Sequence, residues 1–212
     1  MLSEVIFKEE TDVTDKLAFF GVTAPQLLQL AHNVATARSQ ATPLHAANAA
    51  GTFAYHEGVR GKRELFISNQ TGWVAASYKG IEAVENHDKG LIVVFQNVTQ
   101  ACSSNSPKAI SGKKTGSKEL VESNNNFELF PETKPQKTLH ENKSVWYLCV
   151  SSDIENVKVE LSRPTSIDDN GQFSAFSERI FITDYNGDFE PIDTKNSRER
   201  YEADDFEIYK IE

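Results

Sequence analysis

The sequence predicts an α+β fold, in which a helical N-terminal third packs on a mainly antiparallel β-sheet and a long polar loop projects from the middle of the chain. Three observations support this prediction. Two proline-marked helix starts, at residues 23–25 and 42–43, precede apolar residues at helical spacing. Apolar runs typical of strands begin at residue 73 and return after residue 144. A polar stretch over residues 102–142 separates the two groups of runs.

The N-terminal third is expected to hold a short strand or arm over Ser3–Lys8 and then two helices. Thr23 followed by Pro25 is typical of a helix start, because threonine caps the first turn and proline needs no amide partner there. The second helix is expected to begin at Thr42-Pro43 and to run toward Leu65. Its segment HAANAAGTFAYHEG has mostly small side chains, so we expect close packing on more than one side.

The sheet is expected to contain strands whose side chains alternate or are wholly apolar. LIVVF, within Leu91–Val98, is apolar at consecutive positions, as in a central strand covered on both faces. Asn86–Gly90 is expected to form a hairpin loop, and the final FEIYKIE an edge strand. The predicted strands are Trp73–Tyr78, Ile81–Glu85, Leu91–Val98, Val145–Val150, Val157–Leu161 and Glu178–Thr183.

The domain organisation follows from length and from one unusual segment. A chain of 212 residues suits a single α+β domain over residues 1–212. Residues 102–142 are interrupted by Pro131 and Pro135 and rich in polar side chains, which predicts an irregular excursion. Loops of such length in compact domains are usually functional or disordered.

Composition limits the classes of partner and the compartment. The net charge of -9 argues against a general DNA coat or a binder of anionic membranes, because such proteins use lysine and arginine to replace counterions. The first residues lack a signal-peptide pattern and no run reaches the length of a membrane span, so a cytoplasmic protein is expected. Cys102 and Cys149 do not form a disulfide framework or a zinc motif, and we expect no cofactor and no metal. The oligomeric state is left open.

The segment Cys102–Lys118 is the main candidate for ligand binding. It contains four lysines, several hydroxyl groups and two glycines, with no acidic residue. Ammonium groups and flexible backbone amides can surround a phosphate, although the spacing is not that of a Walker loop. A solvated polar loop is the alternative interpretation. The candidate ligand-binding residues are Lys108, Ser111, Lys113, Lys114 and Lys118, with Arg60 as a candidate neighbour.

A Mg²⁺-dependent nuclease is a second hypothesis. Such a site needs carboxylates on adjacent strands and a lysine two residues beyond one of them. Glu57 or Glu64 would come from a helix, and Glu82 and Glu85 from a strand. The expected E-x-K pattern is missing from LIVVFQNV.

An acidic protein-binding inhibitor or adaptor is a third hypothesis, based on the acidic residues of the C-terminal end, 202–212. A charged edge strand that discourages aggregation is the simpler interpretation of that end. The sequence contains no G-x-S-x-G and no G-x-G-x-x-G. Whether the chain is an enzyme is left open, and we expect no catalytic residues. The leading hypothesis is a non-catalytic binding protein that contacts a phosphate-bearing partner, either a nucleic acid or a nucleotide.

Overall fold

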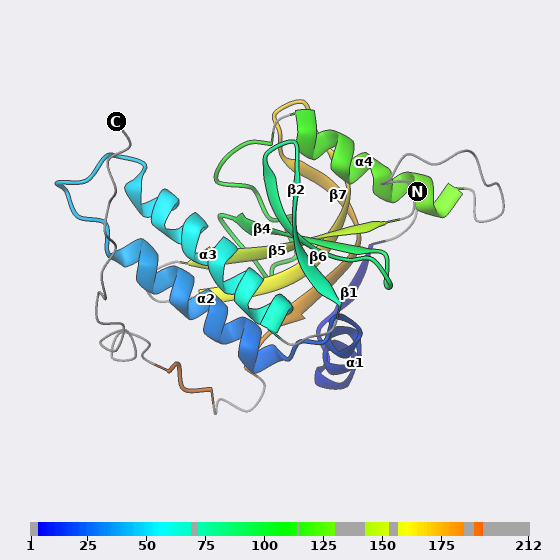
Figure 1. The fold of residues 1–212 in the computed structure, drawn as a ribbon, viewed down its shortest axis with the longest axis horizontal. Coiled ribbons are helices and arrows are strands. Elements are labelled where there is room, and N and C mark those ends of the chain that lie inside the picture. The colour runs from blue at the N-terminus through cyan, green and yellow to red at the C-terminus, as the bar shows by residue number, and fades with distance from the viewer. Residues whose placement is uncertain are drawn as a thin grey trace, which may run out of the picture.

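The computed structural model describes residues 4–68, 72–113, 115–129, 143–152, 157–184 and 189–192. Within these ranges, four helices and seven strands form an α+β domain (Figure 1). The elements follow one another as β1 (Val5–Phe7), α1 (Glu10–Phe20), α2 (Ala24–Ser39), α3 (Ala49–Ser68), β2 (Trp73–Tyr78), β3 (Ile81–Asn86), β4 (Leu91–Asn97), α4 (Thr115–Leu129), β5 (Ser144–Ser152), β6 (Val157–Ile167) and β7 (Phe173–Ile182).

The described strands form one mixed sheet in the order β1-β7-β6-β5-β4-β3-β2. Neighbouring strands are antiparallel except at two places, where β4 pairs with β5 and β1 pairs with β7 in parallel. The prediction of an α+β fold is therefore confirmed, but a mainly antiparallel sheet describes it only in part. The helical N-terminal third also begins with a strand, and β1 lies at the edge of the sheet beside β7.

The starts of the helices follow local capping rules at one position and depart from them at another. At the start of α2, the backbone N–H of Thr23 donates to Gln26 Oε1 at 2.9 Å, which completes a capping box. The next helix, α3, begins at Ala49 and not at Thr42-Pro43 as predicted. Thr42 instead opens a turn, in which its backbone N–H donates to His45 Nδ1 at 3.0 Å.

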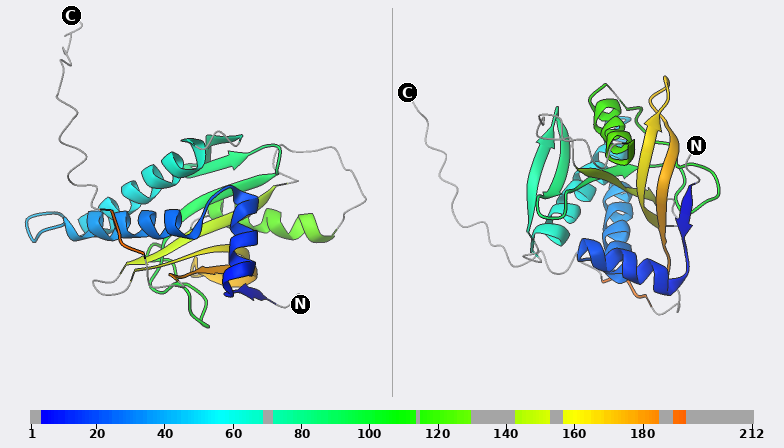
Figure 2. Two further views of the ribbon diagram at one scale, coloured as in Figure 1. Left: turned by 90° about the horizontal axis from the view of Figure 1, so that it is seen from below. Right: turned by 90° about the vertical axis from the view of Figure 1, so that its right-hand side faces the viewer.

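Two apolar cores lie on opposite faces of the sheet. The larger core packs α1, α2 and α3 against one face, and Gly58 of α3 lies so close to β4 that a Cβ atom there would overlap the ring of Phe95. The smaller core packs Leu120 and Val121 of α4 against the other face. The right-hand view of Figure 2 shows α4 across the sheet from α1 and α2.

The structure corrects the prediction that residues 102–142 are irregular. Residues 115–129 form α4, and Asn124 anchors this helix to the sheet. The Asn124 amide donates to the carbonyls of Val145 at 2.9 Å and Pro164 at 2.8 Å, and its oxygen accepts from the N–H of Val145 at 2.7 Å. The remainder of the excursion after residue 129, and the C-terminal FEIYKIE, lie outside the described residues.

Candidate functional site

The structure assigns a structural contact to Lys113, the central lysine of the sequence-predicted site. Its ammonium group donates to Gln96 Oε1 and lies 5.2 Å from the ring of Tyr147 and 5.6 Å from that of Phe173. Burial lowers the pKa of Lys113 to about 8. Its backbone N–H also donates to Gly171 O at 2.8 Å. Lys113 therefore ties the loop to the sheet and to the β6–β7 turn.

The other described residues of the predicted site lie at or near the surface. Lys118 lies on the first turns of α4, with its Nζ 3.5 Å from Asp169 Oδ1. Lys108 and Ser111 are exposed. Lys114 lies outside the described residues. Lys113 and Lys118 thus both contact the β6–β7 turn, through Gly171 and Asp169, while Lys108, Ser111 and Lys118 remain available at the surface.

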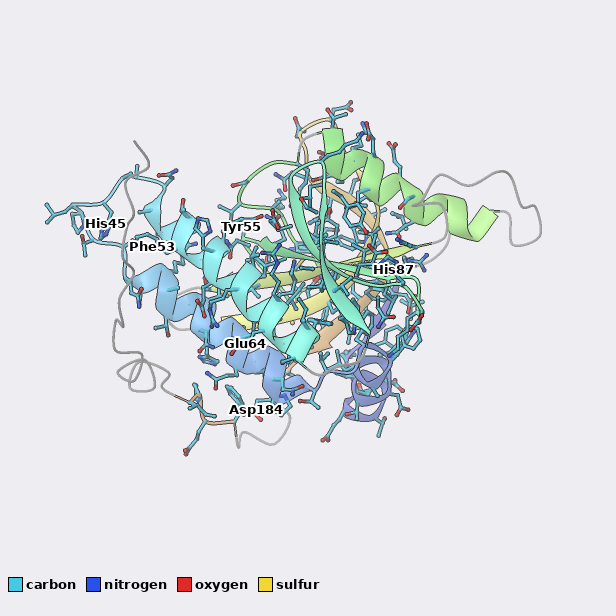
Figure 3. The ribbon with its side chains drawn as sticks, in the orientation of Figure 1. His45, Phe53, Tyr55, Glu64, His87 and Asp184 are labelled. Atoms are coloured by element: carbon cyan, nitrogen blue, oxygen red, sulfur yellow. The ribbon has the colours of Figure 1, made fainter. Side chains whose placement is uncertain are left out.

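Arg60 is not a neighbour of this loop. It lies on α3, which packs on the face of the sheet opposite to α4. Its guanidinium group donates to Glu57 at 3.0 and 2.7 Å and also to Glu64, which Figure 3 labels on α3. Arg60 is thus held by two carboxylates of its own helix.

The carboxylates of the nuclease hypothesis are likewise separated. Glu82 pairs with Arg63 of α3, whereas Glu85 accepts from Lys143 and Tyr78 on the other face of the sheet. Residues three apart on a strand point to opposite faces, so Glu82 and Glu85 do not share a position for one metal. Within the described ranges, no group of three or more His, Cys, Asp or Glu side chains could hold a metal ion.

A cavity of about 510 Å³ lies elsewhere, between α1, β1, β7 and the N-terminal ends of β4 and β5. Four of its lining residues are aromatic. Trp146 is buried, and Phe20 packs edge to face against it with ring centroids 5.1 Å apart. Phe19 is 54% exposed, which leaves an accessible aromatic surface at the cavity. We call this space the α1 cavity; its aromatic residues are Phe7, Phe19, Phe20 and Trp146.

Charged side chains of both signs line the α1 cavity. Lys16 Nζ lies 2.5 Å from Glu178 Oε2, and Arg163 Nη1 lies 3.7 Å from Glu178 Oε1. The carboxylate of Glu178 is therefore the ion-pair partner of both Lys16 and Arg163. Arg163 is only 8% exposed, so the surrounding protein restricts the screening of its charge by water. The carboxylates of Asp12 and Asp15 line the cavity from α1.

Lys89 is the third cation that lines the α1 cavity. Its Nζ donates to the carbonyl of Phe19 at 2.7 Å and lies 5.5 Å from the centre of the Phe19 ring. The turn that carries it is fixed by Asn86, whose Oδ1 accepts from the N–H of Lys89 at 3.0 Å, and Gly90 has a φ of 61°. His87, labelled in Figure 3, marks this turn beside α1.

Sequence reasoning missed the α1 cavity because its walls come from distant segments. Residues near positions 7–20, 89–91, 144–146, 163 and 178 meet only after the sheet has formed. One local signal was present. Four cavity residues of α1 lie in pairs at helical spacings of three or four residues, which places them on one side of the helix: Asp12, Asp15, Lys16 and Phe19.

Comparison with known proteins finds no family model, no curated protein and no solved structure that matches this chain.

In the part of the chain that the structure describes, none of the helices combines the length and the apolar character that crossing a membrane requires. The acidic end, residues 202–212, lies outside the described ranges.

Proposed function

We propose that this protein is a non-catalytic binding protein for a small phosphate-bearing ligand, most simply a mononucleotide, and that the ligand occupies the α1 cavity. The observation that carries the proposal is the combination of aromatic walls with three cations, Lys16, Lys89 and Arg163, around one space. The cavity volume lies within the range usual for small-molecule sites, about 300–1,000 Å³.

The three cations of the lining support an anionic group on the ligand. Lys16, Arg163 and Glu178 together carry one net positive charge, while Asp12 and Asp15 bring the whole lining, with three cations and three carboxylates, to a net charge of zero. Lys89 is the third cation, and its ammonium group donates to the neutral backbone carbonyl of Phe19. A phosphate could take hydrogen bonds from these groups, which are among the stronger ones because both partners are charged.

The aromatic walls support a planar group on the same ligand. The partly exposed ring of Phe19 offers a face for stacking, and Trp146 and Phe20 form an apolar floor. Stacking of a base on an aromatic side chain contributes about 1–3 kcal/mol. Asp12 and Asp15 would accept hydrogen bonds from sugar hydroxyls or exocyclic amines. These features favour a mononucleotide over an isolated phosphate.

The test is isothermal titration calorimetry with AMP, GMP, CMP, UMP and inorganic phosphate. We expect at least one nucleotide to bind more tightly than phosphate. Lys89→Ala should weaken binding about tenfold or more, since it removes a charged hydrogen bond. Phe19→Ala should weaken nucleotide binding without weakening that of phosphate.

Lys108→Ala is the matched control, because it removes one exposed lysine of the basic loop and leaves the α1 cavity intact. Absence of binding for every nucleotide would contradict the proposal. Equal losses in Lys89→Ala and Lys108→Ala would also contradict it, because the effect would then reflect overall charge rather than the cavity.

A further inference from the structure

The outer edge of the sheet at β2 presents a row of backbone groups that no other described strand pairs with. β2 pairs with β3 along its whole length, from Trp73 opposite Asn86 to Tyr78 opposite Ile81. It is the last strand of the sheet, and no described strand pairs with its other side. Between Val74 and Ser77, outward N–H and C=O groups therefore lack a strand partner among the described residues. Such an edge is a template for another strand.

β2 also lacks the features with which proteins usually protect an edge strand. Its sequence, WVAASY, contains no charged residue and no proline, and its register with β3 shows no bulge. Six residues is a usual length for a pairing strand. The opposite edge differs, since β1 has only three residues and is flanked by Glu4 and by Lys8, Glu9 and Glu10. Shortness and several flanking charges thus protect β1, whereas the longer β2 is followed by one charged residue, Lys79.

The chemistry of β2 fits a second copy of the same strand. The whole chain carries a net charge of -9, so most of its surface repels another copy, but β2 itself is uncharged. Antiparallel pairing of two identical strands is self-complementary and satisfies twofold symmetry. A pairing centred on Ala75 places this small side chain opposite its own copy, where the two strands approach most closely. Val74, which is 45% exposed, would lose contact with water in such a pair.

We propose that two copies of this protein associate through antiparallel pairing of their β2 strands, which joins the two sheets into one continuous sheet. The inference does not depend on the α1 cavity, which lies between α1, β1, β7 and the amino ends of β4 and β5 and is not lined by residues of β2. The proposed interaction surface is the outer edge of β2, a strand without a charged residue, a proline or a bulge.

The test is sedimentation equilibrium over about a hundredfold range of protein concentration. We expect the mass to rise from 23.7 kDa toward twice that value. Ala75→Lys, at an exposed position, should weaken the dimer about tenfold, because it places two like charges opposite each other at the twofold axis, and Ser77→Lys, two residues from the axis, should weaken it less. Gln40→Lys, at the exposed end of α2, is the matched control and should leave the dimer unchanged.

A cross-linking measurement keeps the test decisive if a lysine variant does not fold. Ala75→Cys should form an interchain disulfide under mild oxidation, because paired strands bring opposite positions within bonding distance. Gln40→Cys should not. A monomer at all concentrations, or a dimer that persists in both lysine variants and resists cross-linking at position 75, would overturn the proposal.

Discussion

Lys62 provides the sharpest test of the packing between α3 and the sheet. Its side chain is 0% exposed, and its Nζ donates to the backbone carbonyl of Glu82 at 2.8 Å. Burial, with a smaller contribution from the charge of Arg63, lowers the pKa of Lys62 to about 7 from its usual 10.5. The folded protein therefore releases this proton at a much lower pH than the unfolded chain.

The direction of the pH effect follows from proton counting. Between about pH 7 and pH 10.5 the unfolded chain binds a proton at Lys62 that the folded chain has released, so the free energy of unfolding rises with pH. The slope is about 1.4 kcal/mol per pH unit, which gives about 2.7 kcal/mol between pH 7.5 and pH 9.5. Below pH 7 the penalty of the buried charge is fully present. Lys113, with a pKa of about 8, adds to the rise above pH 8.

Urea unfolding at several pH values between about 7 and 9.5 measures this slope. Lys62→Met keeps the length of the side chain and removes the amine, so the variant should lose the part of the slope due to Lys62. Lys108→Met changes an exposed lysine and should keep the full slope. A wild-type free energy of unfolding that is flat or falls over this range would refute the reasoning. So would a Lys62→Met variant with an unchanged slope.

Two further predictions concern close packing and a buried ion pair. Gly58→Ala should destabilise the fold by about 1–3 kcal/mol because its Cβ would overlap Phe95, whereas Gly51→Ala, with open space around it, should stabilise α3 by up to about 1 kcal/mol. Thermal unfolding of the pair measures both, and equal effects would contradict the packing argument. Glu160→Ala should cost about 3–5 kcal/mol, since Arg179, bonded to Glu160 at 2.8 and 3.0 Å, would remain buried with only Glu4 Oε1, 3.6 Å from its Nη1, as a counter-charge. Urea unfolding measures this loss, and a change below about 1 kcal/mol would show that the pair is dispensable.

Elements with strong local signals could be predicted from the sequence. The start of α2 follows from Thr23 and Pro25, whose capping and conformational preferences act within one turn. The position of β4 follows from consecutive apolar residues, and every residue of this strand is buried. In both cases the preference of the segment agrees with its final environment.

α4 could not be predicted because its stabilising contacts are distant in sequence. The segment contains Gly116 and a run of asparagines, which are weak helix formers. Leu120 and Val121 pack on the sheet, and Asn124 bonds to β5 and β6. Missing this helix also hid the parallel pairing of β4 and β5, because parallel neighbours need a crossover connection, which α4 supplies.

The α1 cavity lies at the end of the parallel pair β4 and β5 that the loop before α4 does not cover. Ligands of α/β sheets commonly bind beyond the carboxyl ends of parallel strands. Here Gln96, near the carboxyl end of β4, accepts from Lys113, and the loop before α4 packs over that end. The cavity lies at the amino ends instead, beside Leu91 and Ser144. Lys113, the central lysine of the site predicted from the sequence, therefore packs at the carboxyl end of β4. Lys113→Met should alter stability and leave ligand binding at the amino ends of β4 and β5 intact.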